Sequence, residues 1–444
     1  FGGTYQERIY TAALDTNDNI FIAGNTTSLI GIATPGATQP NLSSGDDAFI
    51  SQFSPTGTLI WSSYYGGDRH ELITSITVDD SNKLYVTGHT ASTDLPCTPN
   101  AHRNTLSGYE NAFLGVLDNT GNILYNSYYI KGSNTRGEGI AIANDGTIYI
   151  AGYTNDTELS PFTGIHQDQN GGYLDGFLLK INTQYQTVWK TYFGGEHNDL
   201  IEGITLDSFQ NIYLTGKTKS IGGIATPTTF QPNYSNSNTW DGFLTQLDSS
   251  SNQIWGTYLD AGGSEDITVI KHQNSSLWLL GMTDGINLST DATSLQQTNN
   301  GGYDNILLNF STSGNKIWTT YFGEANDEFG YDMDFANNNK ILITGQTSSN
   351  VNFVTSNAHQ NNYGGHIYDG FWSILCQPTQ PTTLSHNNTL NICEGDSIEV
   401  SSLNNFNSYS WSTGSTSNAI YISTPGNYIL ETIDNNNCPG KSDT

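Results

Sequence analysis

Acidic side chains recur at one position of an internal repeat, 17 residues before a glycine that ends a hydrophobic segment. The acids at this position are Glu7, Glu71, Asp199 and Glu328. Carboxylates held close together raise each other's pKa or recruit a cation, and a set of oxygen ligands suits Ca²⁺. These residues are therefore candidates for a cation or sugar site. The structural alternative is that each carboxylate accepts backbone N–H groups from the glycine-rich corner just before it.

The same position is uncharged in two other repeats, which carry Thr135 and Ser264. A catalytic site normally breaks the symmetry of a repeat, so the recurrence of the acids favours the structural alternative. A second series, within Asp-Gly-Phe-like motifs, is expected to fix a loop-to-strand turn by side-chain-to-backbone hydrogen bonds. Its members are Asp47, Asn111, Asp175, Asp241, Asp304 and Asp369.

Sequence motifs of the common enzyme classes are missing. The chain has no His-Glu-x-x-His, no Gly-x-Ser-x-Gly, no P-loop and no dinucleotide-binding fingerprint. We therefore assign no catalytic residue and no cofactor other than Ca²⁺ as a candidate. A glycosidase needs two acids at a set separation, which depends on distances across the fold. A carbohydrate-active enzyme, glycosidase or lyase, using the acids above thus stays open as the alternative to a non-enzymatic protein.

The elements that must position these acids follow from the repeat itself. The glycine that ends each hydrophobic segment recurs at Gly24, Gly88, Gly152, Gly216, Gly281 and Gly345. The intervals are 64, 64, 64, 65 and 64 residues, and a threonine follows each glycine two positions later. A later aromatic residue recurs as Trp61, Tyr125, Trp189, Trp255 and Trp318. Such a period indicates a repeat architecture.

Each repeat predicts four short strands, for example 71–79, 83–88, 112–118 and 122–129. Four-stranded antiparallel units at a fixed long period are typical of a β-propeller with one unit per blade. A linear β-solenoid is the alternative, although its repeats are usually shorter. The fold is therefore predicted to be all-β, a six-bladed propeller over residues 1–376. The first strand of each blade should line the channel and place its acid at one mouth.

The sixth repeat stops after its third strand, at about residue 375. Propellers commonly complete the last blade with a strand from the other terminus, which protects the sheet edge. We expect residues upstream of Phe1 to supply this strand, with a Trp and a Tyr in it. The ring then has six blades, unless a whole blade lies upstream.

A polar linker is predicted at 377–385, and 386–444 then predicts the strands of a small β-sandwich. Cys393 and Cys438 flank these strands, and a disulfide between them would stabilise a domain with a small core. Such a bond indicates an oxidising, extracytoplasmic compartment. Cys97 and Cys376 are expected on opposite faces of the propeller and therefore should not pair.

The charge of the chain excludes two classes of partner. Lys and Arg number 14 against 42 Asp and Glu, giving a formal net charge of −28. Phosphate binding needs clustered Lys and Arg, so neither a nucleic acid nor an anionic membrane surface is expected as a partner. No apolar segment approaches the roughly 20 residues needed to span a bilayer, and no membrane insertion is predicted.

The repeat pattern Tyr-Phe-Gly-Gly, Tyr-(Leu/Ile/Val)-(Ala/Thr)-Gly-x-Thr, Asp-Gly-Phe and Trp-x-x-Tyr resembles a bacterial β-propeller repeat family often called seven-bladed. The segment from Cys393 to Thr444 resembles immunoglobulin-like modules of secreted Bacteroidetes proteins. In those modules a further strand follows the segment, so the resemblance implies that the domain is cut short at its C-terminal end. This resemblance implies a secreted or cell-surface, adhesin-like binding and display protein exported by a type IX secretion system. Its implied partners are the secretion machinery and an extracellular glycan or protein. A calcium-stabilised scaffold is a third hypothesis.

Overall fold

The structure is a computed structural model of the 444-residue chain. It describes all residues except 44, 158–161, 163, 235–238, 292–293, 337–339, 350–359, 361–362, 365–366, 378–383, 387–394, 435–437 and 443–444. The described elements are 28 β-strands, gathered in six propeller sheets and two small sheets of the tail. No helix capable of crossing a lipid bilayer occurs within these ranges.

Five propeller blades have four antiparallel strands each, and the sixth has three. The first and second blades comprise β1 (Glu7–Leu14), β2 (Ile20–Thr26), β3 (Asp47–Phe53), β4 (Leu59–Tyr65), β5 (Glu71–Val78), β6 (Leu84–Thr90), β7 (Asn111–Leu117) and β8 (Ile123–Tyr128). The third and fourth comprise β9 (Thr135–Ile142), β10 (Ile148–Thr154), β11 (Asp175–Ile181), β12 (Thr187–Phe193), β13 (Asp199–Leu206), β14 (Ile212–Thr218), β15 (Asp241–Leu247) and β16 (Gln253–Leu259). The fifth and sixth comprise β17 (Glu265–Gln273), β18 (Ser276–Thr283), β19 (Asp304–Ser311), β20 (Lys316–Phe322), β21 (Glu328–Ala336), β22 (Lys340–Thr347) and β23 (Asp369–Cys376).

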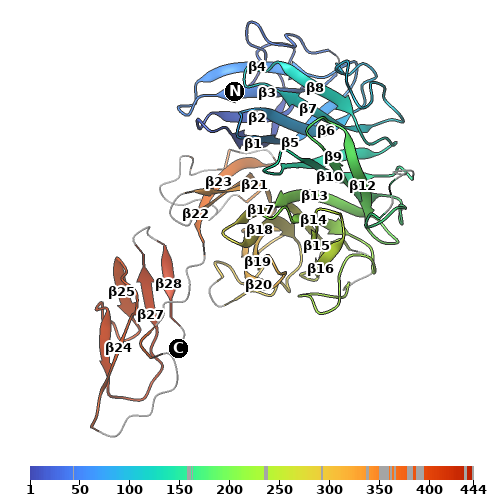
Figure 1. Ribbon diagram of the computed structural model, residues 1–444. Coiled ribbons are helices and arrows are strands. Elements are labelled where there is room, and N and C mark those ends of the chain that lie inside the picture. Colours follow the sequence, from blue (N-terminus) through green and yellow to red (C-terminus); the bar gives the residue numbers. More distant parts are fainter. Residues whose placement is uncertain are drawn as a thin grey trace.

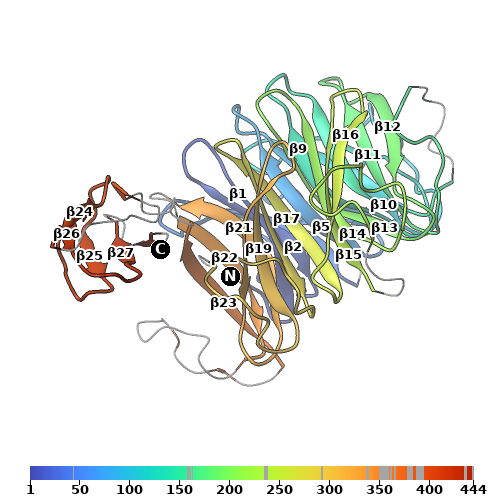
Figure 2. The same cartoon turned by 90° about the horizontal axis from the view of Figure 1, so that it is seen from below.

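The blades are arranged in sequence order, with the first strand of each blade innermost (Figures 1 and 2). Each inner strand contacts the inner strand of the next blade, from β1 and β5 through to β17 and β21. The charges of Arg8 and Tyr10 on β1 act on the pKa of Tyr331 on β21, so the sixth blade lies next to the first. The predicted all-β, six-bladed propeller is therefore confirmed.

The hydrophobic core lies between neighbouring blades, since one cluster joins Phe21 and Ile50 of the first blade to Ile73 and Val86 of the second. The fourth-strand tryptophans reach across the same boundaries. Trp61 donates its indole N–H to the carbonyl of Asn119, in the third turn of the next blade, at 3.0 Å. Trp189 and Trp255 repeat this contact with Ser249 and Thr312. The recurring tryptophan thus links the first blade to the second, the third to the fourth and the fourth to the fifth.

The sixth blade ends at β23, whose outer edge is not paired with a described strand. Trp372 on this strand is 64% exposed. Ile9 of β1 is 52% exposed, whereas the equivalent Ile73 of β5 is fully buried by the blade before it. The seam between the sixth and first blades is therefore less tightly packed than the other boundaries.

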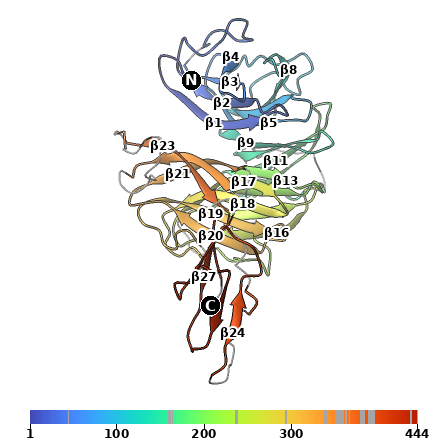
Figure 3. The ribbon, with the colours of Figure 1, turned by 90° about the vertical axis from the view of Figure 1, so that its left-hand side faces the viewer.

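The tail contains two small antiparallel sheets beside the propeller (Figures 1 and 3). One pairs β24 (Ile398–Ser401) with β26 (Ala419–Ile422), and the other has the order β25 (Ser408–Trp411), β27 (Leu430–Ile433) and β28 (Pro439–Lys441). Their shared core is built on Val400, Trp411 and Leu430, all buried. Leu384 joins this core and pairs with Ser402.

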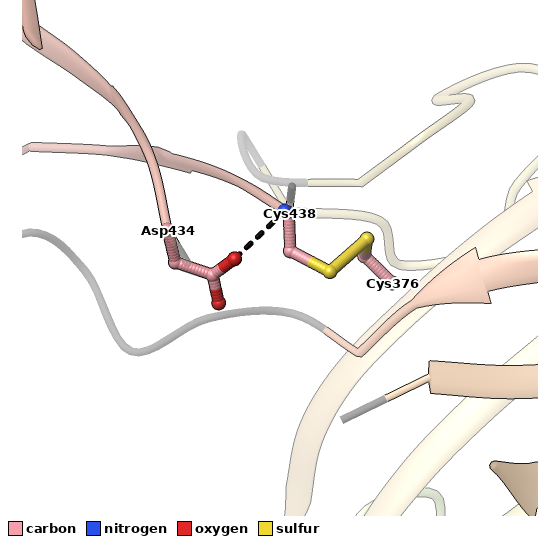
Figure 4. Close-up of a disulfide and its surroundings, with 3 residues drawn as sticks. All are labelled: Cys376, Asp434 and Cys438. Atoms are coloured by element: carbon pink, nitrogen blue, oxygen red, sulfur yellow. Dashed lines mark hydrogen bonds between the residues drawn. A yellow bond between two sulfur atoms is a disulfide. The ribbon is translucent and has the colours of Figure 1, made fainter. Parts of the chain in front are cut away.

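The structure corrects the predicted disulfide. Cys438 is bonded to Cys376, with a Cα–Cα distance of 5.6 Å, and not to Cys393, which lies outside the described residues (Figure 4). The backbone N–H of Cys438 also donates to Asp434 Oδ1 at 2.8 Å. The sequence predicts a bond that closes within the tail, whereas the observed bond joins the tail to the end of β23. Cys97 is a free thiol, so its predicted failure to pair with Cys376 is confirmed.

We predict that the Cys376→Ser/Cys438→Ser double variant leaves the propeller folded and loosens the tail. The bond closes a loop with a sequence separation of 62 residues, and loop entropy for that length corresponds to about 4 kcal/mol. Urea titration with limited proteolysis of the tail measures the loss. The control is Cys97→Ser, which removes a thiol without removing a crosslink. Equal proteolysis of the two variants would contradict the prediction.

Candidate functional site

The predicted acids are each the first residue of an inner strand. Glu7 begins β1, Glu71 begins β5, Asp199 begins β13 and Glu328 begins β21. They do not gather into one group, since each lies at the corner where its own blade starts. Within the described ranges, one group of three potential ligands has its oxygen atoms within 4.8 Å of one another, and it consists of Asp241, Asp260 and Glu265.

Glu71 shows what the acid does at its corner. Its Oε2 accepts the backbone N–H of Gly67 at 2.9 Å, and its Oε1 accepts the hydroxyl of Thr90 at 2.5 Å. The Thr90 oxygen in turn accepts the N–H of Ser92 at 3.0 Å. The same pair of contacts is made by Glu7 with Gly3 and Thr26, by Asp199 with Gly195 and Thr218, and by Glu328 with Glu324 and Thr347. The threonine of the repeat therefore holds the acid to the second strand of its blade.

The preceding blade contributes a glutamine and an aspartate to the same corner. Gln39 donates from Nε2 to Asp47 at 2.7 Å and accepts the N–H of Gly66 through Oε1 at 2.9 Å. Asp47 also accepts the N–H of Ser43, which is the predicted loop-to-strand turn. Gln167 and Gln296 repeat both contacts, with Asp175 and Gly194 and with Asp304 and Gly323. Each of these corners is thus a hydrogen-bonded joint between two blades.

The corner glycine is required by the two carboxylates beside it. A Cβ atom on Gly66 would lie 2.3 Å from Oε2 of Glu71 and 3.1 Å from Cγ of Asp47. A Cβ on Gly323 would lie 2.5 Å from Cγ of Asp304 and 2.7 Å from Oε2 of Glu328. Two acids from different blades therefore approach each other across a residue without a side chain.

Burial raises the pKa of these carboxyl groups, because the low-dielectric corner disfavours the charged form. The pKa of Glu71 rises to about 6, and that of Asp199 rises to about 7, with a smaller contribution from the charge of Asp175. Burial likewise raises the pKa of Asp175 and of Asp304 to about 6. Several corner acids therefore exchange protons close to neutral pH.

The corner between the second and third blades carries no acid in these positions. Asn111 replaces the aspartate, Thr135 replaces the acid that begins the inner strand, and Arg103 stands where other blades have glutamine. The Thr135 hydroxyl lies 2.7 Å from that of Thr154. This corner therefore lacks both of the carboxylates that meet at the acidic corners.

The fifth blade has an acid that the sequence analysis missed. Counting 17 residues back from Gly281 gives Ser264, but β17 begins at Glu265, which accepts the Thr283 hydroxyl at 2.6 Å. The first turn of this blade is one residue shorter, with Asn274 and Ser275 both at positive φ, as in a type I′ hairpin. Allowing for that shorter turn in the sequence would have identified Glu265.

A second cluster of charged side chains lies on the inner strands β9, β13 and β17 and on β14, the second strand of the fourth blade. Lys217 of β14 lies 3.0 Å from Glu202 of β13 and 2.5 Å from Asp266 of β17. Burial raises the pKa of nearby Glu138 on β9 to about 7, against the opposing charges of Arg136 and Lys217. We call these five residues the Lys217 cluster: Arg136, Glu138, Glu202, Lys217 and Asp266. Glu138 and Glu202 share one position of the repeat, 14 residues before Gly152 and Gly216, whereas Lys217 and Asp266 occupy no recurring acidic or basic position and carry no repeat signal.

Comparisons with known proteins agree with the architecture. Residues 188–223, from β12 to the loop after β14, match a family model described as a beta-propeller repeat. This match covers one segment of the chain, and it agrees with the repeated blades of the propeller. The comparison with curated protein sequences found no match.

Solved structures with a similar chain path include Kuenenia stuttgartiensis hydrazine synthase, at 12% identity, covering 78% of this chain and 80% of that one, with a TM-score of 0.42. The endosialidase of phage phi92 is 10% identical over 98% of this chain and 85% of that one, with a TM-score of 0.40. A beta-xylosidase/alpha-arabinofuranosidase from a compost microbial metagenome is 11% identical over 72% and 98%, with a TM-score of 0.33. These similarities are too low to carry an argument about activity.

We predict that the stability of the protein falls as the pH rises from about 5 to about 8. The folded-state pKa of Asp199 is raised to about 7, so below that value the folded protein holds a proton that the unfolded chain has released. In Asp199→Asn the fall in the free energy of unfolding should be smaller by about 1–3 kcal/mol. Urea unfolding at several pH values measures it.

The matched control is Asp80→Asn, which removes an exposed aspartate from a turn of the second blade. Its pH dependence should follow that of the unmodified protein. The prediction fails if Asp199→Asn and Asp80→Asn give parallel curves.

Proposed function

We propose that the chain is a secreted or cell-surface binding and display module of an adhesin-like protein, without enzymatic activity. In this proposal the propeller presents a ligand-binding face and the tail is an immunoglobulin-like spacer. The protein is exported by a type IX secretion system, and its ligand is an extracellular glycan or protein. The calcium hypothesis is separate from this proposal.

The observation that carries the proposal is the use of the recurring acids within the fold. Glu7, Glu71, Asp199 and Glu328 each accept one backbone N–H and one threonine hydroxyl at their own corner. Acids bound in this way hold the blades together and do not face one another across a substrate. A rigid scaffold with variable loops is the usual platform for binding.

The disulfide and the loop aromatics support an extracellular binding role. A Cys376–Cys438 bond persists in oxidising compartments and not in a reducing cytosol. Tyr109 and Tyr173 are 62% and 68% exposed, and both lie two residues before the third strand of their blade. Tyrosines that present a flat apolar ring and a polar hydroxyl suit contacts to sugars and to proteins.

A carbohydrate-active enzyme remains the second candidate, and the Lys217 cluster is the observation that favours it. Glu138 and Glu202 lie on adjacent inner strands, and burial raises the pKa of both. A carboxyl group with a raised pKa is what a general acid requires. Against this, Lys217 already neutralises Glu202 and Asp266 by direct ion pairs.

We predict binding without turnover when the chain is tested on a glycan array and in a polysaccharide hydrolysis screen. Tyr109→Ser/Tyr173→Ser should weaken any glycan binding by about tenfold, since stacking on two aromatic rings is lost. The control is Phe209→Ser, which removes an exposed ring from the opposite, turn end of β13.

Hydrolysis that is abolished by Glu202→Gln or Glu71→Gln, and kept in Glu399→Gln on the exposed face of β24, would establish the enzyme instead. Unchanged folding of each variant is checked by circular dichroism. An array with no bound glycan directs the search to protein ligands.

A further inference from the structure

One inter-blade corner differs from the others in having a third acid. Asp260 stands five residues before Glu265, where the other acidic corners have Gly66, Gly194 and Gly323 before their own acids. A side chain would collide with two carboxylates at Gly66 and Gly323, and with Asp199 at Gly194. At the corner between the fourth and fifth blades, a residue with its own carboxylate occupies the space instead.

One of the two hydrogen bonds of the corner glutamine differs at this corner, namely the one that its side-chain N–H group donates. Gln231 corresponds to Gln39, but it donates from Nε2 to the backbone carbonyl of Asp260 at 3.2 Å, and its Oε1 accepts the Asp260 N–H at 3.0 Å. These two bonds fix Asp260 in place. In the other blades, Gln39, Gln167 and Gln296 donate from Nε2 to the aspartate that begins their own third strand.

Glu265 carries an unsatisfied oxygen into this group of acids. Its side chain is 1% exposed, and Oε1 accepts the hydroxyl of Thr283. Its Oε2 has no hydrogen-bond donor of ordinary geometry among the described residues, although the N–H of Ala261 faces the carboxylate. By contrast, Oε2 of Glu71 accepts a well-formed bond from Gly67. A buried carboxylate oxygen without a donor is costly unless a cation or a proton satisfies it.

The distances and the charge at the corner fit a small cation. Neither Asp260 nor Glu265 forms an ion pair with a described Lys, Arg or His. The oxygens of Asp241, Asp260 and Glu265 lie within 4.8 Å of one another, and Ca–O distances of about 2.3–2.6 Å allow one ion to reach all three.

We propose that Asp241, Asp260 and Glu265 bind one Ca²⁺ at the boundary between the fourth and fifth blades. The ligand set is made only of carboxylate oxygens, which favours a hard cation, and water completes the coordination. Two of the three acids come from the fourth blade and Glu265 comes from the fifth. The ion therefore joins two blades at the one acidic corner where the glycine is missing.

The test is calorimetric titration of the chelator-treated full chain with CaCl₂, together with its melting temperature in CaCl₂ and in chelator. The expected result is one ion per chain, with a dissociation constant of at most about 10⁻³ M, and a higher melting temperature with calcium. MgCl₂ at the same concentration should give a smaller shift, because Mg²⁺ demands a tighter octahedral site.

Asp260→Gly recreates the corner of the other repeats, so it should fold and bind calcium at least about tenfold more weakly. Asp260→Asn keeps the side-chain shape and removes the charge, and it serves if the glycine variant does not fold. The matched control is Glu324→Gln, which removes an acid from the next corner.

The proposal is overturned if the unmodified chain shows no calcium-dependent heat or melting shift. It is also overturned if Asp260→Gly and Asp260→Asn bind calcium as tightly as Glu324→Gln does. An equal response to Mg²⁺ and Ca²⁺ would overturn the assignment to calcium.

Discussion

The propeller depends on the hydrogen-bonded joint at each corner between blades. A glutamine and an aspartate of one blade, a glycine backbone, and an acid and a threonine of the next blade form one connected set, as at Gln39, Asp47, Gly66, Glu71 and Thr90. Most of these groups are buried, so removing one leaves its partner without compensation in a low-dielectric site. The joint therefore fixes how adjacent blades meet, in addition to the hydrophobic side chains that pack between them.

The joint places two carboxylates from different blades against the same glycine, and this arrangement has an electrostatic cost. The structure meets the cost in three ways. At Asp47 and Glu71, donors from the backbone, glutamine and threonine surround the acids. At Asn111 the charges are removed altogether, as its partner Thr135 is also neutral. At Glu265 a third acid raises the cost further, and bound protons or a cation are needed to meet it.

The repeating part of this structure could be predicted from the sequence because the same residue pattern, and with it the same local geometry, occurs six times at intervals of about 64 residues. The number of blades, the strand pattern and the role of the aspartate in the turn all follow from recurring residues such as Asp47 and Thr90. Contacts that occur once carry no such signal. Cys438 pairs with Cys376 because the end of β23 meets the tail in space, and no spacing in the sequence encodes that meeting. Glu265 was hidden by a turn shorter by one residue, and Lys217 by its position outside any recurring marker.

The two departures from symmetry meet on a single strand. Glu265 and Asp266 are consecutive residues at the start of β17, and neighbouring residues of a strand point to opposite faces of the sheet. Glu265 faces the corner with Thr283, whereas Asp266 faces Lys217. The first two residues of β17 are therefore a corner acid and one member of the Lys217 cluster, Asp266. Since the inner strands at the other acidic corners begin with an acid on one face only, the fourth and fifth blades are where a ligand would find chemistry that the rest of the ring does not offer.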